Sequence, residues 1–583
     1  MARRDPHSYN DDTQVETESL AWIARVDFAT KTITADATLS FRAPGGGTLD
    51  LDTRDLAIDA VTDLDGAVLA YTLHPAEPVL GARLAIELPA GSRGVRIRYR
   101  TSPDASALQW LDPAQTSGKQ APYLFSQCQA IHARSVVPLQ DTPRLRIRYT
   151  AALTIPKMLR AVMAAAPVER VEQGDVAIEH YAMPQPIPPY LIAFAVGDLA
   201  SRDVSPRSRV WAEPDVVDAA AYEFGGVEEM IRAAEGLFGP YDWDRFDILT
   251  MPPSFPYGGM ENPRLTFLTP SVIAGDRSLV RIVAHELAHS WTGNLVTNAN
   301  AEHFWLNEGF TVYAERRILE VIYGVDVATL NAALGRRVLD ESLARFADRP
   351  QLTRLRTQLW NVDPDDAYSA VPYQKGYFFL VTLENAVGRK AFDAWLKTYL
   401  AAFRFQAITT DDFIDHFDGA FRGILADVDA SAWIDGEGMP EIPKPHSTKL
   451  EAIEALGATC PTREQVAAWT ATEWMLFLES IPKPATLELC YQLDTEHRLT
   501  DSTNYEVLVS WLELALRSGY GAVLQRTEEV LGAMGRMKFL RPLYAALAEQ
   551  PQFRETGSSL FERYRATYHP IARQMVESLV TRR

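Results

Sequence analysis

Two histidines and a glutamate in the stretch HELAHSW have the spacing of a metal site. His285 and His289 are four residues apart, and Glu286 follows the first histidine. Residues four apart share one face of an α-helix, so both imidazoles can hold one ion from adjacent turns. Glu286 is rotated by about 100° from His285, which suits a base beside the metal better than a ligand. The pattern predicts a zinc site with Glu286 as the general base.

A third ligand is expected from a neighbouring element. Glu308, in WLNEGF, lies nineteen residues after His289. Trp305 and Leu306 beside it indicate a helix packed into a core, which can bring Glu308 back to the histidines. Two histidines and one glutamate leave a fourth zinc position for water, as a catalytic site requires. The alternative, an exposed helix with chance histidines, is disfavoured by the specificity of the motif.

The N-terminal part of the chain, which precedes the metal motif, is predicted to consist of strands. In KTITADATLSFR, residues 31–42, apolar side chains at every second position alternate with polar ones. This period of two is typical of a strand with one buried face. Similar stretches, separated by Gly and Pro clusters, predict a β domain over residues 1–200.

Helical spacing begins after residue 200 and predicts a mixed α/β domain over residues 201–435. The proline-rich stretch GEGMPEIPKPHS, residues 436–447, indicates an extended linker. Residues 448–583 are expected to be helical. There Thr462 and Gln465 form a possible capping box, opening a helix that would carry Val466, Trp469 and Leu476.

Bulk composition limits the partners. The 583 residues carry a formal net charge of −19, which disfavours nucleic acid and anionic membranes. The start, MARRDPHSYNDD, has a basic pair but no apolar run of a signal peptide. Apolar windows such as YLIAFAV are far shorter than the roughly 20 residues that span a bilayer. Only three cysteines, Cys128, Cys460 and Cys490, are present, so we expect a cytoplasmic protein.

Longer motifs resemble one enzyme family. HELAHSW with WLNEGF, preceded by PYGGMEN at 256–262, resembles the zinc aminopeptidases of the gluzincin class known as peptidase family M1. PYLFSQCQAIHARSVVPLQDTP, DPDDAYSAVPYQKG and GRMKFLRPL are similar to its leukotriene A4 hydrolase branch, which includes aminopeptidase B. The resemblance implies a saddle-like N-terminal β-sheet domain, a thermolysin-like catalytic domain and a C-terminal domain of helix pairs.

The resemblance also implies how a substrate is held at its N-terminal end. Glu261 matches the glutamate that binds the free α-amine, and the glycines beside it would let the backbone approach a peptide. Gln127 and Gln129 match glutamines of the cleft, and alternation on a strand would put both on one face, with Cys128 turned away. His132 has no partner at ligand spacing and is expected to be structural. The segment implied to contact substrate comprises Tyr257, Gly258, Gly259, Met260 and Glu261.

Further residues are implied at the other end of the cleft. Tyr373 matches a tyrosine that stabilises the oxyanion, Tyr368 a second active-site tyrosine, and Asp365 an acidic residue of the deeper pocket. Arg536 and Lys538 match a basic pair that holds the substrate's carboxylate. The residues alone favour a tyrosine-rich helix entry for the first three and a solvated surface for the basic pair, and only the resemblance favours the active-site roles.

These observations predict a zinc aminopeptidase that acts on short peptides with a free N-terminus, as a monomer with one Zn²⁺ per chain. Three alternatives stay open. The first is epoxide hydrolysis at the same zinc, which Tyr368 and Asp365 favour. Ala301 disfavours it, because the vertebrate hydrolases have a tryptophan at this position. The second is a scaffold without catalysis, and the third a thermolysin-like endopeptidase, against which Glu261 argues because an internal peptide carries no ammonium.

Overall fold

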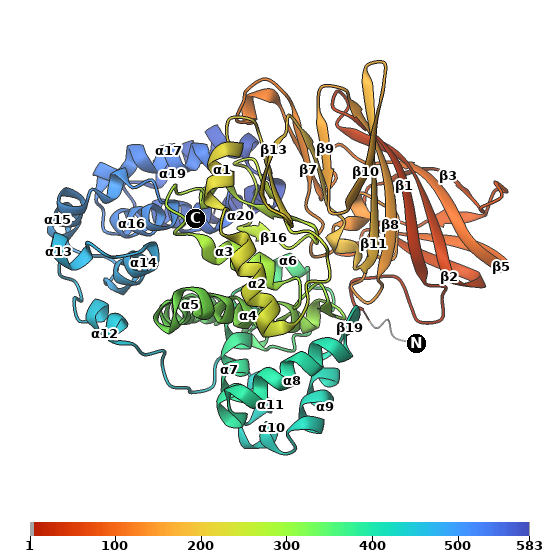
Figure 1. Cartoon of the computed structure of the whole chain (residues 1–583). Coiled ribbons are helices and arrows are strands. Elements are labelled where there is room, and N and C mark those ends of the chain that lie inside the picture. The colour runs from red at the N-terminus through yellow and green to blue at the C-terminus, as the bar shows by residue number, and fades with distance from the viewer. Residues whose placement is uncertain (1–4, 582–583) are drawn as a thin grey trace.

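Three domains follow one another along the chain in the computed structural model (Figure 1). The structure describes residues 5–581, so the basic pair at positions 3 and 4 lies outside the described residues. A domain of β-sheets is followed by a mixed domain and then by a domain of helices alone. This confirms the predicted multidomain α+β class.

The N-terminal domain is built on an eight-stranded sheet of order β10-β11-β8-β1-β2-β5-β3, with β4 paired to β5. The alternation predicted for residues 31–42 is confirmed, since Ile33, Ala37 and Leu39 of β2 are fully buried. The strands are β1 (Thr17–Asp27), β2 (Thr32–Thr53), β3 (Ala57–Thr62), β4 (Tyr71–Leu73), β5 (Ala82–Arg100), β8 (Ile147–Pro156), β10 (Ala166–Gln173) and β11 (Val176–Ile187).

A smaller sheet of this domain faces the mixed domain. Its order is β6-β7-β12-β9. Its apolar residues share one core with Met251, Phe255 and Met260 of the mixed domain, so the two domains are packed without a polar boundary. The strands are β6 (Leu108–Leu111), β7 (Tyr123–Ser126), β9 (Arg160–Met163) and β12 (Phe194–Gly197).

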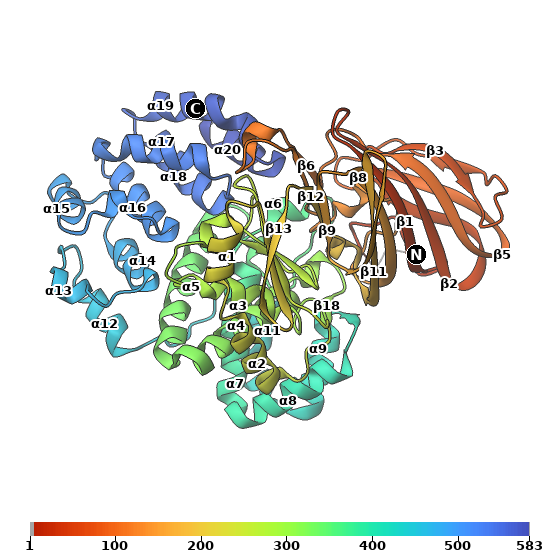
Figure 2. The ribbon, with the colours of Figure 1, turned by 45° about the horizontal axis from the view of Figure 1, so that its top comes forward.

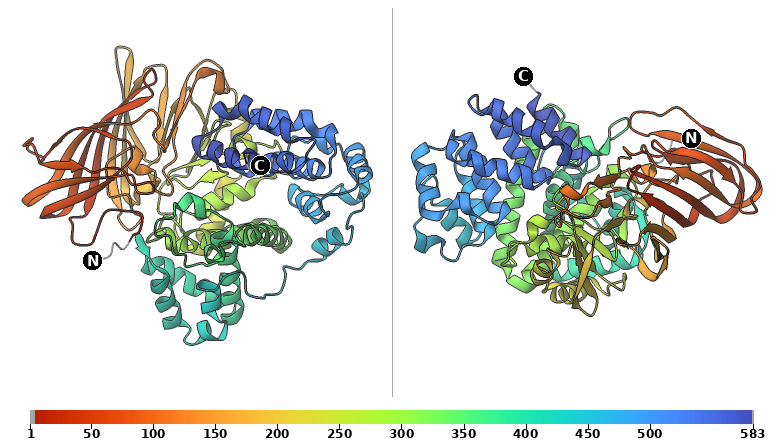
Figure 3. Two further views of the ribbon diagram at one scale, coloured as in Figure 1. Left: turned by 180° about the vertical axis from the view of Figure 1, so that it is seen from behind. Right: turned by 90° about the horizontal axis from the view of Figure 1, so that it is seen from above.

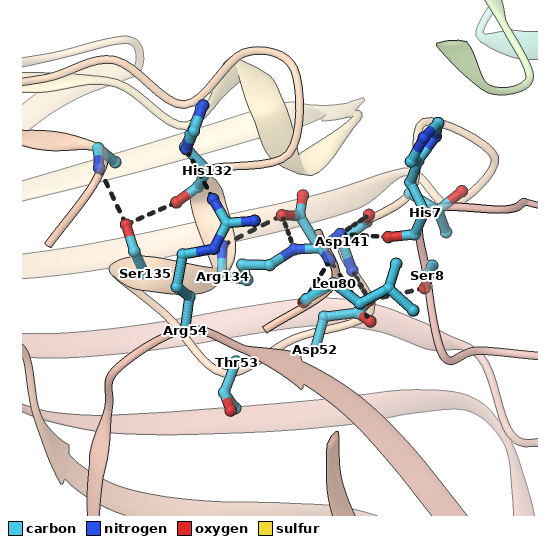
Figure 4. A network of polar contacts seen from close by, with 12 residues as sticks. His7, Ser8, Asp52, Thr53, Arg54, Leu80, His132, Arg134, Ser135 and Asp141 are labelled. Atoms are coloured by element: carbon cyan, nitrogen blue, oxygen red, sulfur yellow. Dashed lines mark hydrogen bonds and ion pairs between the residues drawn. The ribbon is translucent and has the colours of Figure 1, made fainter. Parts of the chain in front are cut away.

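A buried polar network fixes the segment before β1 to the large sheet (Figure 4). The Arg134 guanidinium, which is fully buried, donates to Asp141 Oδ2 at 2.9 Å and to the carbonyls of Leu80 and His7. Asp52 accepts from the Ser8 hydroxyl at 2.6 Å. Each buried charge therefore has charged or polar partners, as burial requires.

The mixed domain contains a five-stranded sheet of order β13-β14-β15-β17-β16, whose last strand is an edge antiparallel to β17. Two further strands, β18 and β19, pair in parallel. The strands are β13 (Ala200–Ser205), β14 (Ser208–Ala212), β15 (Asp247–Thr250), β16 (Gly259–Met260), β17 (Leu265–Leu268), β18 (Val296–Asn298) and β19 (Gln406–Ile408). The helices are α1 (Val217–Glu223), α2 (Val227–Phe238), α3 (Val280–Ala288), α4 (Trp305–Tyr323), α5 (Val325–Arg345), α6 (Pro364–Ala367), α7 (Gly376–Val387), α8 (Arg389–Ala402), α9 (Thr410–Ala420), α10 (Ile424–Asp427) and α11 (Ala430–Ile434).

The C-terminal helices form a curved layer beside the mixed domain and end near the N-terminal domain (Figures 2 and 3). No helix or strand occurs between α11 and α12. The helices are α12 (Thr448–Glu454), α13 (Arg463–Val466), α14 (Ala471–Ser480), α15 (Leu487–His497), α16 (Tyr505–Arg517), α17 (Leu524–Ala533), α18 (Met537–Glu549), α19 (Arg554–Tyr564) and α20 (Pro570–Val580). Within residues 5–581, no helix combines the length and apolarity needed to cross a membrane.

One predicted helix is wrong in extent. Thr462 and Gln465 do form a capping box, but α13 ends at Val466. Thr470 has an extended backbone and forms a second capping box with Glu473, which opens α14. Val466 therefore ends α13, Leu476 belongs to α14, and Trp469 lies between the two helices, because a second capping residue restarts the backbone hydrogen bonding.

Candidate metal and active site

Helices α3 and α4 bring three predicted metal ligands together. His285 lies in the last turn of α3, His289 directly follows the helix, and Glu308 lies in the first turn of α4. Glu308 Oε2 is 3.4 Å from His285 Nε2 and 3.6 Å from His289 Nε2. The two Nε2 atoms are 3.3 Å apart.

Hydrogen bonds behind the histidines orient these atoms. His285 Nδ1 lies 2.9 Å from Glu315 Oε2, and His289 Nδ1 lies 3.1 Å from the Thr292 carbonyl. A carbonyl and a carboxylate only accept, so each Nδ1 donates and each Nε2 turns its lone pair toward Glu308. Glu308 Oε2 is buried without a hydrogen-bond partner among the described residues. Three converging acceptors of this kind fit a divalent metal ion such as Zn²⁺.

Two further carboxylates are buried against this set. Glu261 is 4% exposed and Glu286 is 6% exposed, and ligand atoms of both lie within 4.8 Å of one another and of His289. Burial raises the pKa of Glu286 to about 8, and burial with Glu308 and Glu286 nearby raises the pKa of Glu261 well above its usual range. Within residues 5–581 no ion pair joins Glu261 to a cationic side chain, so an arriving cation would further stabilise its anionic form.

The edge strand β16 passes directly over the candidate base. A Cβ on Gly259 would lie 2.3 Å from Glu286 Oε1, so only glycine fits at this position. The same segment is held from below, since Asn294 Nδ2 donates to the Glu261 carbonyl at 2.7 Å. The backbone that precedes Glu261 is thus fixed, and β16 is an edge strand, the kind of element to which an extended peptide can add.

The sequence predicted that Gln127 and Gln129 lie on a strand, and this is wrong. Strand β7 ends at Ser126, one residue before Gln127. Both side chains nevertheless reach the β16 segment: Gln127 Nε2 lies 3.2 Å from Met260 Sδ, and Gln129 Nε2 donates to Glu261 Oε1 at 3.1 Å. Cys128 between them is buried in the core, as expected.

Two tyrosines lie near the histidines. The Tyr373 ring stacks on His285 with centroids 6.1 Å apart, and its hydroxyl lies 3.3 Å from that of Tyr368. Tyr368 is 45% exposed, and its ring also packs near Tyr257 at 6.2 Å. Burial raises the pKa of Tyr373 well above its usual value, so its hydroxyl remains a proton donor at neutral pH.

Asp365 has a partner from another domain. His132, expected to have only a structural role, places Nε2 2.9 Å from Asp365 Oδ2. Arg54 Nη1 lies 3.0 Å from His132 Nδ1 (Figure 4). Because a guanidinium only donates, Nδ1 accepts, and Nε2 donates to Asp365. The sequence offered no sign of this contact because the two residues are far apart in the chain.

The basic pair from the helical domain is already partly engaged. Glu506 accepts from Arg536 Nη1 at 2.7 Å and from Lys538 Nζ at 2.5 Å. The Arg536 side chain is buried, whereas the Lys538 side chain is 46% exposed. A Cβ on Gly258 would lie 2.8 Å from Arg536 Nη2, so the guanidinium rests against the β16 segment.

Comparisons with known proteins place these features in a family. The model of the Peptidase M1 N-terminal domain matches residues 6–191, that of the Peptidase family M1 domain residues 222–433, and that of the Leukotriene A4 hydrolase C-terminal domain residues 469–580. A leukotriene A-4 hydrolase from Xenopus laevis is 39% identical over 599 residues, covering 98% of both chains. The chain belongs to peptidase family M1.

Other members of the M1 family are similarly close. Leucine aminopeptidase 2 from Emericella nidulans is 39% identical over 555 residues, covering 90% of this chain and 89% of its own. The structure of yeast LTA4 hydrolase in complex with bestatin matches with a TM-score of 0.93 at 32% identity, covering 99% and 97% of the two chains. The family makes this chain a metallopeptidase.

Sequence reasoning missed two acidic residues of this M1 site. Glu315 orients His285, and it could have been found because it lies seven residues, or two helical turns, after Glu308. Glu506 pairs with both members of the basic pair from a different helix, and no local spacing predicts that contact.

Proposed function

We propose that this M1 chain is a zinc-dependent aminopeptidase that removes single residues from the N-termini of short peptides. One observation carries the proposal: the Glu261 carboxylate lies within 4.8 Å of ligand atoms of Glu286 and His289. A substrate ammonium paired with Glu261 brings the first peptide bond beside the metal ligands and the base. The burial of Glu261 leaves little room for a longer N-terminal extension.

The roles of the side chains follow from their positions. One Zn²⁺ per chain, held by His285, His289 and Glu308, would supply Lewis-acid chemistry to water and to the scissile carbonyl. Glu286 accepts a proton from the attacking water and returns it to the leaving amine. The Tyr373 hydroxyl donates to the oxygen on which negative charge develops.

The other end of a short peptide is held by the basic pair. Lys538 is the more exposed cation, and it is the group that a substrate carboxylate meets first. With Glu506 bound to both cations, the three side chains carry a net charge of one positive, which matches a single carboxylate. Anchors at both ends favour tripeptides over long chains, with Gln127, Gln129, Tyr257, Tyr368 and Asp365 lining the space between.

The cysteines and the net charge bear on where the protein acts. All three cysteines, Cys128, Cys460 and Cys490, are free thiols, which suits a reducing compartment. We propose a cytoplasmic monomer that binds neither nucleic acid nor membranes, as its net charge of −19 favours.

A rate survey tests the proposal. Purified protein is incubated with reporter amides of all amino acids and with tripeptides bearing free or acetylated N-termini, with and without a chelator. We expect cleavage of free N-termini alone, its loss with the chelator and its return with Zn²⁺. Equal cleavage of acetylated peptides would favour an endopeptidase and reject the role of Glu261.

Epoxide hydrolysis is a second candidate because a relative 39% identical over nearly the whole chain is named leukotriene A-4 hydrolase. Tyr368, exposed and close to Tyr373, is available to such a substrate. Ala301 packs against a small apolar cluster of Phe346, Leu352 and Leu359, and a larger side chain at this position would change the packing of that cluster. Adding a lipid epoxide to the survey separates the two activities, since diol formation would establish the second.

A further inference from the structure

Tyr373 lies in an unusual piece of backbone. Residues Val371–Lys375 form a single π-helical turn that leads into α7. Such turns are rare and less favourable than α-helix, and they occur mostly where a side chain must be aimed at a functional site. Something must therefore hold this turn in place against relaxation to regular helix.

Lys375, at the end of the turn, is completely buried. Its ammonium donates to the carbonyls of Thr353 at 3.0 Å and Gly436 at 2.8 Å. Among the described residues no carboxylate forms an ion pair with it. Burial, together with the charge of Arg354, lowers the pKa of this ammonium to about 8, against the opposing effect of Asp435. A buried cation bound only to neutral carbonyls is costly, and methionine would fill similar space without that cost.

The two carbonyls come from separate parts of the mixed domain. Thr353 ends a short 3₁₀ turn after α5, and Gly436 follows α11. The Lys375 ammonium therefore connects the π turn to two segments that are remote from it in sequence. Only a long side chain with several donors can reach both.

The rest of the turn is fixed to α4, the helix that carries Glu308. Arg316 Nη2 donates to Gln374 Oε1 at 2.7 Å. Gly376 lies against Gly309, so closely that a Cβ on Gly376 would be 2.9 Å from the Gly309 Cα. The turn is thus held on one side by α4 and on the other by Lys375, with Tyr373 between them.

We propose that Lys375 is a positioning residue for Tyr373, whose role as oxyanion donor rests on the proposed function. The Lys375 ammonium clamps the π turn to Thr353 and Gly436, and this keeps the Tyr373 hydroxyl at the reacting carbonyl. Because Tyr373 would bond the substrate most strongly in the transition state, loss of the clamp lowers kcat and leaves KM unchanged.

A double-mutant cycle tests this with Lys375→Met, Tyr373→Phe and the double variant in the full-length zinc-loaded enzyme. On the best tripeptide of the survey, we expect Lys375→Met to lower kcat about 10- to 100-fold. KM should stay within about twofold. In the Tyr373→Phe background, Lys375→Met should change kcat by less than about twofold, because the side chain that it positions has lost its hydroxyl.

Lys397→Met is the matched control, since Lys397 donates to the Gly236 carbonyl at 3.1 Å at an exposed site away from the turn. It should keep the parent kcat. Lys375→Gln, which retains a donor, is measured as well in case Lys375→Met does not fold, and it should fall between Lys375→Met and the parent.

Three outcomes would overturn the inference. Equal losses from Lys375→Met in both backgrounds would mean that Lys375 only stabilises the fold. If Lys375→Met keeps the parent kcat while Tyr373→Phe is strongly impaired, the positioning role of Lys375 is rejected and the proposed function is not affected. Parent-like kcat for Tyr373→Phe would instead reject the oxyanion role and the positioning role together.

Discussion

Buried acids in this protein fall into two groups that differ in their partners. Although burial opposes ionisation, Lys538 and Arg536 hold the pKa of Glu506 far below its usual range. Among the described residues Glu261 and Glu286 form no ion pair with a cation, and burial raises the pKa of each. The second group is therefore poised for ligands or proton transfer, whereas Glu506 organises its neighbours.

Glu286→Gln tests the assignment of the base. The amide keeps the size of the side chain, and the metal ligands are untouched, so zinc content should stay at that of the parent. Without a proton acceptor, kcat should fall by about 10²- to 10⁴-fold. Metal analysis and steady-state kinetics on one tripeptide check both statements, and unchanged turnover would reject Glu286 as the base.

Among the elements, α4 is the one on which the site depends most. Its residues are buried from Trp305 to Leu319, including the charged side chains of Glu308, Glu315, Arg316 and Arg317. A helix buried all round is usually apolar, because charge is costly away from water. Polar residues on such a helix therefore indicate metal ligands and the side chains that orient them by hydrogen bonds.

Glu315→Gln should weaken zinc binding through this helix. The amide can no longer fix the tautomer and orientation of His285 as a carboxylate does at 2.9 Å. Loss of such a partner costs about 10- to 100-fold in metal affinity. Competition with a chelator of known affinity measures the change. Glu320→Gln, on the exposed end of α4, is the control, and equal affinities for the two variants would contradict the expectation.

On the scale of the whole molecule, the three domains lie against one another (Figures 1 and 3), and each supplies side chains around the candidate site. His132 of the N-terminal domain bonds Asp365 of the mixed domain. Arg536 and Lys538 come from the helical domain, where the backbone of Met537 also donates to the Pro256 carbonyl at 2.8 Å. The residues proposed to contact substrate are thus divided among domains, so domain packing would control the geometry of the site.

Arg134→Met should destabilise the N-terminal domain and its link to the cleft. It would leave the buried Asp141 carboxylate without its cation and three carbonyls, those of His7, Leu80 and Asp141, without this donor. Breaking a buried pair in this way costs about 3–5 kcal/mol. Denaturant unfolding measures the loss. Arg148→Met removes an exposed arginine of β8, and a similar loss for both variants would show that burial is not the cause.

Local physics explains what could be predicted. The alternation in β2 and the helical character of the C-terminal third follow from periods of two and 3.6 residues, and both are confirmed. Likewise, the four-residue spacing of His285 and His289 predicts that both imidazoles lie on one face of a helix and can bind the same ion. The break between α13 and α14 was not predicted. Two capping boxes follow each other within a few residues, and the helical period does not show that the second one starts a new helix.

The sequence by itself determined the family, the domain classes and the residues of the metal motif, since these are encoded in contiguous motifs and short periods. Only the tertiary structure decided that Glu261 lies beside Glu286, that His132 bonds Asp365, and that Lys375 reaches Thr353 and Gly436. These contacts join residues that have no fixed spacing in the chain. They form only when separate elements pack, because burial forces each polar group to find whichever partner the fold brings near.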